Sequence, residues 1–402
     1  FMSVRKRLLV LTPRFPYPVV GGDRLRIYNQ CKVLSEHFDL TLLSLCESKD
    51  ELAIDVADDR VFRRVERVYL SKVISYLKVM LSLVTRSPLQ VAYYRSSLFK
   101  KRVVKEARSH DLVLCHLIRT ADYVRDVEIL KVLEMTDAIS LNYQRVSENE
   151  EVKGIRALLY RMERKRVLHY ECESFGRFDA CSLISVVDKE YLVGSCRESS
   201  EKIMVAGNGV AVDKYPFQFC GYDYRSPLRI VFIGAMDTLP NFDAAYWFAR
   251  KVLPLISEGR AVLFEVVGRI SESHAAKLSA LDDVIVRATV PEVCEAVKGA
   301  HIAVAPMRIG AGIQNKILEY MALGLPCITS SLGLEGISAV PNEHLLVANS
   351  PVEYVDSVEV ILSDPVATSA MAASARELVE TEYTWSKQQA EFVNRIHGLL
   401  TK

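Results

Sequence analysis

The stretch IAVAPMRIGAGIQNKILEYMALGLPCIT, residues 302–329, joins two short apolar runs through a glycine-rich loop and an amphipathic segment. The runs Ile302–Ala305 and Cys327–Thr329 are nearly continuous rather than alternating, as in strands buried on both faces of a parallel sheet. Between them we expect a helix that begins near Ile313. The order strand, glycine loop, helix, strand predicts a unit of an open parallel sheet.

The same alternation recurs along the rest of the chain. A first set of apolar runs comprises Leu8–Leu11, Leu40–Leu45, Val65–Leu70, Leu112–Cys115, Leu130–Met135, Ala180–Ser185 and Ile203–Ala206. A second set comprises Ile230–Ile233, Leu263–Val267, Val284–Val286, Ile302–Ala305, Cys327–Thr329 and Leu345–Ala348. Amphipathic stretches such as Asn241–Ile256 separate the runs. Two sets predict two doubly wound α/β domains, and 402 residues are enough for both.

The least repetitive stretch lies between the two sets and contains Pro216, Gly221 and Pro227. We therefore expect an N-terminal acceptor-side domain at 1–209, a hinge at 210–227 and a C-terminal nucleotide-sugar domain at 228–384. The helix at 385–402 is expected to cross back to the N-terminal domain. Because open parallel sheets bind ligands beyond the carboxyl ends of their strands, the two domains are expected to face each other across a cleft.

Composition excludes several classes of protein. Half of the residues are hydrophobic and a quarter are charged, which excludes a disordered or collagen-like chain. No uncharged apolar run reaches the ~18 residues of a membrane-spanning helix, and the stretch after Arg5-Lys6-Arg7 is too short for a signal peptide. The nine cysteines include no CxxC pair, so we expect reduced, buried thiols in a cytoplasmic protein rather than a zinc cluster or disulfides.

Charge is distributed unevenly. Residues 1–226 contain 37 Lys/Arg and 30 Asp/Glu, whereas residues 227–402 contain 14 and 20. Within 60–108, 13 basic residues face only Glu66 and Glu106. This basic segment indicates either an anionic membrane surface, a phosphate-bearing partner, or simply a solvated face; nothing indicates nucleic acid.

Residues 72–84, within that segment, favour a more specific interpretation. Their apolar residues recur at helical spacing beside Lys72 and Lys78, as in a helix that lies in a membrane interface. A helix packed on its own domain has the same pattern, so a peripheral position at the inner face of the membrane is one of two alternatives.

Two further glycine loops follow expected strands. Gly21-Gly22, followed by Arg24, precedes the first expected helix, and Gly234 opens the second domain. Glycines let a backbone approach a ligand closely and leave helix N–H groups directed at an anion, although a plain tight turn needs the same residues. Neither loop is a dinucleotide fingerprint of the GxGxxG type.

The loop after Ala305 indicates a diphosphate site. A helix N-terminus offers unpaired N–H donors and partial positive charge, and Arg308 and Lys316 flank it. Glu319 lies one turn further on the face of Lys316, where its carboxylate can accept hydrogen bonds from ribose hydroxyls. A solvated helix carboxylate is the alternative for Glu319. We predict Lys316 and Arg308 as the groups that stabilise a leaving diphosphate.

The stretch 305–326 resembles the donor-site signature of retaining glycosyltransferases of family 4, in the GT-B superfamily. Other segments resemble elements of a bacterial, polysaccharide-associated branch: Pro13–Gly22, Lys202–Val210, Ile233–Asn241, Val266–Gly268 and Ser331–Gly336. The resemblance implies the GT-B fold and transfer of a hexosyl group, with retained configuration, from a GDP- or UDP-hexose to a glycan or lipid-linked acceptor. It implies surface polysaccharide synthesis, exopolysaccharide included. No cluster of carboxylates at metal-ligand spacing is visible, and the phosphates already have cationic partners, so we expect neither a metal nor another cofactor.

Site residues follow from the motifs and the resemblance together. The predicted donor-binding residues are Gly22, Gly234, Gly268, Gly310, Gly312, Ile313, Gln314, Asn315 and Glu319. Gly21 and Arg24 are predicted on the acceptor side. The sequence departs from the family at Ala311, where the signature has its first glutamate, and it lacks the family's Arg and Lys near Asn241. Arg308 and Lys316 are the expected replacements.

Two polar residues follow strands of the first domain. His116 either faces the cleft with a catalytic role or bonds to the backbone at a strand end; Asp137 either orients a sugar or caps a helix. Two other functions stay open at this point. One is a nucleotide-sugar epimerase of the same fold, and the other is a non-catalytic GT-B partner subunit, which the loss of the first glutamate permits.

Overall fold

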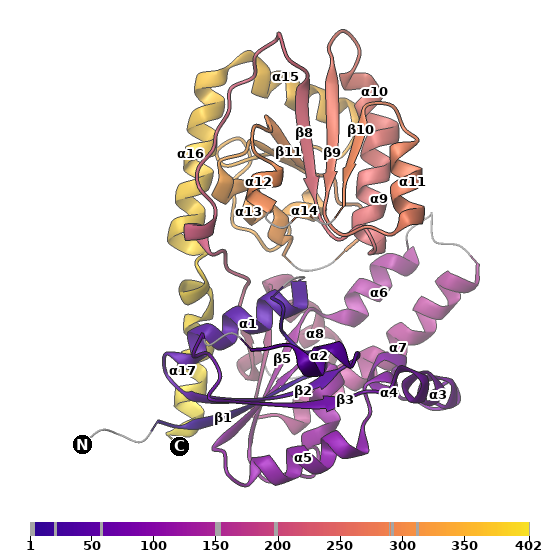
Figure 1. The fold of residues 1–402 in the computed structure, drawn as a ribbon, viewed down its shortest axis with the longest axis vertical. Helices are drawn as coiled ribbons and strands as arrows, with labels where there is room; N and C mark the ends of the chain where they lie inside the picture. Colours follow the sequence, from indigo (N-terminus) through magenta and orange to yellow (C-terminus); the bar gives the residue numbers. More distant parts are fainter. Residues whose placement is uncertain are drawn as a thin grey trace. The chain divides into compact units, whose positions relative to one another are not determined.

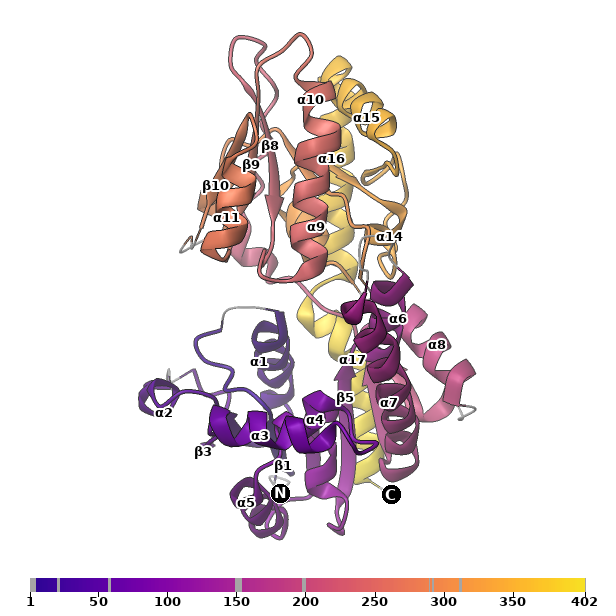
Figure 2. The same cartoon turned by 90° about the vertical axis from the view of Figure 1, so that its right-hand side faces the viewer.

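The computed structural model describes residues 5–19, 22–56, 59–148, 154–196, 200–288, 290, 293–310 and 313–401. The chain divides into two compact units, one formed by Phe1–Gly207 with Gln389–Lys402 and the other by Asn208–Gln388. In two views, helices flank the sheet of each unit (Figures 1 and 2). Within the described residues, no helix is both long and apolar enough to span a membrane.

The first unit contains a seven-stranded parallel sheet in the order β3-β2-β1-β4-β5-β6-β7. Its strands are β1 (Arg7–Thr12), β2 (Asp39–Cys46), β3 (Arg64–Tyr69), β4 (Leu112–His116), β5 (Leu130–Thr136), β6 (Ala180–Leu183) and β7 (Ile203–Val205). Its helices are α1 (Gly22–Ser35), α2 (Asp50–Ala53), α3 (Lys72–Ser82), α4 (Leu89–Tyr93), α5 (Ser97–Ala107), η1 (Ile118–Val124), α6 (Ile139–Glu148), α7 (Ile155–Arg177), α8 (Val186–Cys196) and η2 (Ser200–Lys202). The central strands β1, β2 and β4 are almost entirely buried, which explains their continuous apolar runs.

The second unit contains a six-stranded parallel sheet in the order β10-β9-β8-β11-β12-β13. Its strands are β8 (Leu228–Ile233), β9 (Val262–Val267), β10 (Val284–Arg287), β11 (Ile302–Ala305), β12 (Cys327–Thr329) and β13 (Leu346–Val347). Its helices are η3 (Val212–Lys214), α9 (Leu239–Trp247), η4 (Phe248–Val252), α10 (Leu253–Ile256), α11 (Glu272–Ser279), α12 (Val293–Ala296), α13 (Asn315–Leu323), α14 (Ser331–Leu334), α15 (Pro351–Ser363) and α16 (Pro365–Glu382). Helix α17 (Trp385–Leu400) spans the boundary between the units.

The predicted architecture of two doubly wound parallel sheets is confirmed, and each predicted apolar run contains or overlaps a strand. One local prediction needs correction. The helix expected near Ile313 begins there, at Asn315, but the stretch 241–256 is not one α-helix. Its middle turn, η4, is a π-helix, and α10 then begins with Pro254 in its first turn. Pro254 has no amide hydrogen, so the regular hydrogen-bond ladder is interrupted there.

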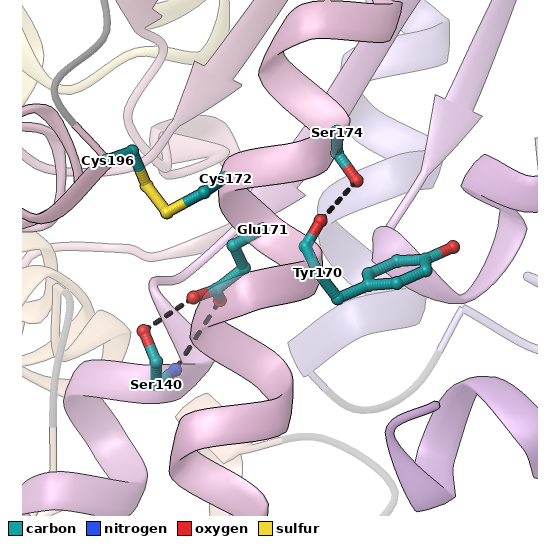
Figure 3. Close-up of a disulfide and its surroundings, with 6 residues drawn as sticks. All are labelled: Ser140, Tyr170, Glu171, Cys172, Ser174 and Cys196. Atoms are coloured by element: carbon teal, nitrogen blue, oxygen red, sulfur yellow. Dashed lines mark hydrogen bonds between the residues drawn. A yellow bond between two sulfur atoms is a disulfide. The ribbon is translucent and has the colours of Figure 1, made fainter. Parts of the chain in front are cut away.

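The expectation that the cysteines are reduced and buried is wrong in two respects. Cys172 on α7 and Cys196 on α8 form a disulfide (Figure 3), and Cys220 is exposed. The packing of α7 against α8 brings the two cysteines together across 24 residues of sequence. The sequence did not predict this disulfide, because its two cysteines do not have CxxC spacing.

Hydrogen bonds show where the segments 207–227 and 389–402 pack. Gln389 donates from Nε2 to the Gly207 carbonyl, and its Oε1 accepts a bond from Gln30, so the C-terminal segment packs within the first unit. The segment predicted as a hinge is counted with the second unit. There the Gln218 amide donates to the Leu323 carbonyl.

Candidate functional site

Two glycines allow the loops after β8 and β9 to meet. The Gly234 amide donates to the Val267 carbonyl at 3.0 Å, and the Gly268 amide donates to the Arg287 carbonyl at 3.1 Å. Gly268 has a φ of 130°, and a Cβ there would lie 2.2 Å from the Gly234 carbonyl oxygen. Only glycine fits at Gly268, so this part of the carboxyl edge of the sheet is bare backbone.

The loop after β11, which leads into α13, also contains a glycine in an unusual backbone conformation. Gly310 has a φ of 140°, in the left-handed region that favours glycine. Gln314 is the N-cap of α13 but makes no capping bond with its side chain. Ile313 is buried, and Asn315 accepts a hydrogen bond from Asn208 at 2.7 Å. The predicted residue Gly312, like Ala311, lies outside the described residues.

Lys316 is buried in the first turn of α13, with only 9% of its surface exposed. Its Nζ donates to Asn241 Oδ1 at 2.9 Å and to Gln314 Oε1 at 3.0 Å. Met307 Sδ lies 3.7 Å away, and the ring of Phe232 lies beneath the ammonium. Burial lowers the pKa of Lys316 to about 8, although the nearby Glu319 acts in the opposite direction. Among the described residues, the hydrogen-bond acceptors of the ammonium are thus neutral, and an anionic ligand would stabilise its charge.

Glu319 lies three residues further along α13 and is half-buried. Burial raises the pKa of this carboxyl to about 7, while the charge of Lys316 and a hydrogen bond from Tyr215 oppose the rise. The carboxylate is thus set in a partly dehydrated position, with Lys316 close enough to influence its charge.

Arg308 lies on the loop after β11 and points toward α9. Its Nη1 is 3.8 Å from Asp243 Oδ1, and its guanidinium lies 5.6 Å from the centre of the Trp247 ring. Asn241, which accepts from Lys316, is on the same helix. Helix α9 thus orients both predicted cations. The sequence motifs did not assign Asn241, Asp243 or Tyr215 a role, because these partners lie far from α13 in sequence.

In the first unit, Gly22 begins α1, and a Cβ there would meet nothing within 4 Å. Gly21 lies outside the described residues. Arg24 pairs with Glu51, with 2.6 Å between Nη2 and Oε1, which gives this predicted acceptor-side residue an internal partner.

His116 takes part in a buried ionic cluster that the sequence did not predict. Its Nδ1 lies 2.5 Å from Glu134 Oε2, and Arg26 Nε donates to Glu134 Oε1 at 2.8 Å. Burial would raise the pKa of Glu134, but Arg26 and His116 lower it to about 2. His116 therefore bonds to a carboxylate rather than to the backbone alternative. The sequence feature that could have indicated a role for Glu134 is its position as a charged residue within an otherwise apolar run that forms a strand.

Asp137 follows β5, and its Oδ1 is buried without a hydrogen-bond partner. Burial and the neighbouring Asp188 raise the pKa of Asp137 to about 8. Glu171 lies in a similar environment; it accepts bonds from the Ile139 amide and the Ser140 side chain, and burial raises its pKa to about 8. Among the described residues, no group of three or more His, Cys, Asp or Glu could hold a metal ion.

Comparison with known proteins shows which families and folds the chain resembles. Residues 227–364, which include α9 and α13, match the family model of glycosyl transferases group 1. An uncharacterised 44.6 kDa protein in the cps region of Klebsiella pneumoniae is 24% identical over 369 residues, which are 88% of this chain and 90% of that protein.

Solved structures resemble the whole chain. Sucrose-phosphate synthase from Thermosynechococcus elongatus superposes with a TM-score of 0.75 at 12% identity, covering 99% of this chain and all of that one. Anabaena HepE in complex with UDP-glucose gives 0.67 at 11% identity, covering 97% and 99%. The chain therefore has the GT-B fold of these glycosyltransferases, as its sequence predicts.

Proposed function

We propose that the chain is a retaining glycosyltransferase that moves a hexosyl group from a nucleotide sugar to a glycan or lipid-linked acceptor. The observation that carries the proposal is the pair at the start of α13, the buried Lys316 and the half-buried Glu319, after Gly310 and beside the glycine edge of the sheet. The match of residues 227–364 to group 1 glycosyl transferases supports the reaction class. The complex of HepE with UDP-glucose supports a UDP-hexose donor.

Each group has a defined task in this proposal. Glu319 accepts hydrogen bonds from the ribose hydroxyls, while Lys316, Arg308 and the amides of α13 bind the diphosphate. In the transfer, the bond from the anomeric carbon to the phosphate oxygen breaks. The acceptor oxygen bonds to that carbon on the same face, and its proton passes to the leaving diphosphate.

Charge therefore accumulates beside the buried ammonium of Lys316, which is held by the neutral acceptors Asn241 and Gln314. A preorganised cation of this kind stabilises the transition state without reorganisation, so no metal is required in this proposal. Retention of configuration rests on the family resemblance of residues 305–326.

The biological setting is also part of the proposal. The relative from the cps region of Klebsiella pneumoniae favours surface polysaccharide synthesis. Helix α3 favours a peripheral position on the inner face of the membrane, because its apolar side chains, such as Val73 and Met80, are exposed beside Lys72. Co-sedimentation with anionic vesicles that weakens with salt would support this position; indifference to lipid charge would remove it.

A donor panel tests the reaction class. UDP-, GDP- and dTDP-hexoses are screened for a rise in melting temperature, and the products of the best donor are then analysed with and without acceptor. We expect one nucleotide to stabilise the protein and to lose this effect in Lys316→Met, but not in the exposed control Lys251→Met. A rearranged sugar from donor alone would indicate an epimerase, and absence of any donor binding would indicate a non-catalytic subunit.

A further inference from the structure

The first unit contains a cavity of about 700 Å³ with basic walls. It lies among α3, α4, η1 and the start of α5, and its walls include Lys78, Arg95, Lys100, Arg119, Arg125 and Asp122. Helix α3 follows β3 and η1 follows β4, so the cavity is at the carboxyl edge of the sheet. Ligands of open parallel sheets bind at that edge. None of the predicted donor-binding residues lines it.

The charge of this cavity exceeds what its own acids neutralise. Arg95 and Arg125 share Asp122, at 3.4 and 3.1 Å, and Lys100 pairs with Asp126. Arg125 has a further partner, Glu173. The five basic side chains of the walls therefore have three carboxylates as partners, which are those of Asp122, Asp126 and Glu173.

Two of the five cations have neutral partners. Lys78 Nζ donates to the Arg95 carbonyl at 2.6 Å, and Arg119 Nε donates to Gln90 Oε1 at 3.0 Å. Among the described residues, neither cation pairs with a carboxylate. Both cations are therefore available to an anionic ligand, although Arg119 also acts on the carboxylate of Asp23. A neutral glycan would not use this charge.

The start of helix α5 forms part of the same wall. Ser96 and Ser97 line the cavity, and α5 runs for 11 residues from Ser97. Ser96 is the N-cap: its side chain accepts from the Phe99 amide, and its own amide donates to the Tyr123 hydroxyl. The positive end of the helix dipole thus acts on the cavity together with the basic side chains. Hydroxyls, amides and guanidinium groups are the donors that phosphate oxygens prefer.

Apolar surface borders this basic cavity, on helix α3. The two most buried residues of α3 are Ser75 and Ser82, at 0% and 4% exposure, whereas most of its large apolar residues, Leu77 and Met80 among them, are exposed. Leu81 is 72% exposed and also lines the cavity. Helix α3 packs mainly against α4, at the margin of the unit (Figure 1). A ligand that fills the cavity would have its remainder beside hydrocarbon-binding surface.

We propose that this cavity binds the phosphate or diphosphate head group of a lipid-linked acceptor, whose hydrocarbon chain lies along the exposed face of α3. The assignment rests on the proposed transferase function and deepens it, since it selects a lipid acceptor over a free glycan. A free phosphate would gain nothing from α3, and attraction to a membrane surface would need no cavity.

The probe is farnesyl diphosphate, a short prenyl chain with a diphosphate head, titrated by calorimetry below its micelle concentration. Inorganic pyrophosphate and farnesol are titrated in parallel. We expect farnesyl diphosphate to bind at least tenfold more tightly than either. We also expect the variant Lys78→Gln/Arg119→Gln to lose at least tenfold in its affinity for farnesyl diphosphate, while Lys101→Gln, on an exposed position of α5 outside the cavity, stays unchanged.

The contrary outcomes are distinct. Equal affinity for pyrophosphate would make this a free-phosphate site, and unchanged affinity in the double variant would move the site elsewhere. Should the double variant melt early, Lys78→Gln alone repeats the test at a half-buried position. Donor binding without farnesyl diphosphate binding would overturn this inference and keep the proposed function. Lipid binding without donor binding would overturn the acceptor assignment.

Discussion

Binding of the nucleotide diphosphate is predicted to depend on pH through Lys316. Burial lowers the pKa of this ammonium to about 8 from an ordinary 10.5, and its hydrogen-bond acceptors, Asn241 and Gln314, are neutral. A diphosphate in contact favours the charged form and returns the pKa toward its ordinary value. Above pH 8, the free protein must therefore take up a proton in order to bind the ligand.

The magnitude follows from this pKa. With a value of about 8 in the free protein, roughly 90% of Lys316 is protonated at pH 7 and roughly 10% at pH 9, so affinity should fall about tenfold over that range. Lys316→Met should remove the dependence and weaken binding at pH 7. Its turnover should fall by about two to three powers of ten, since one lost preorganised electrostatic contact costs about 2.7–4 kcal/mol in the transition state.

Calorimetry with UDP and GDP between pH 7 and 9 measures both effects. The nucleotide phosphates keep a constant charge there, because their last pKa is about 6. Titrations in two buffers of different ionisation enthalpy should show about one proton taken up per nucleotide at pH 9. The exposed variant Lys251→Met is the matched control. A flat affinity from pH 7 to 9, no proton uptake and normal turnover in Lys316→Met would refute the argument.

Three further predictions concern Glu319, metal ions and Glu171. Glu319→Gln should weaken UDP or GDP binding at least tenfold, since a charge-assisted contact is worth over ~1.4 kcal/mol. The control Glu258→Gln, at an exposed position, should leave the affinity unchanged. Equal affinities in the two variants, with normal melting temperatures, would assign Glu319 a structural role through its hydrogen bond with Tyr215. Transfer should persist in EDTA, and activity lost in EDTA but restored by magnesium or manganese would contradict metal independence. The folded pKa of Glu171, about 8, exceeds its ordinary 4.5, so the free energy of unfolding should fall by up to about 1.4 kcal/mol per unit as pH rises from 5 to 8. Glu171→Gln should make this slope shallower in urea unfolding without abolishing it, because Asp137 also has a raised pKa of about 8. Equal slopes in the two proteins would argue against the burial of the Glu171 carboxyl.

The strands could be predicted because their signal is local. Runs such as Leu8–Leu11 and Ile302–Ala305 are continuously apolar since both faces of a parallel sheet are covered. The π-helical turn at 248–252 could not be predicted from the same pattern. Apolar periodicity is similar for α- and π-helical turns, and only the position of Pro254 hinted at an interrupted ladder.

The candidate site was predictable only where its residues are neighbours in sequence. Lys316 and Glu319 lie one turn apart on one helix, so spacing alone places them together. The partner that orients Lys316 is Asn241, 75 residues away, and the carboxylate that holds His116 is on the next strand. Which polar side chains meet across a fold is decided by strand order and register, and no local pattern encodes either.

Helix α3 was predicted from its sequence, but the side that it presents to solvent was not. Periodicity established which of its side chains share a face, but not which face the unit covers. The structure buries Ser75 and Ser82 and leaves Leu77 and Leu81 in solvent, although burial of each leucine would stabilise by about 1.5–3 kcal/mol. A sequence that forgoes this stabilisation along one helix, and places Lys78 and a basic cavity beside it, is better explained by a partner that covers the apolar face than by the folding of the unit alone. That partner must combine hydrocarbon with negative charge, which is the description of a phosphate-bearing lipid.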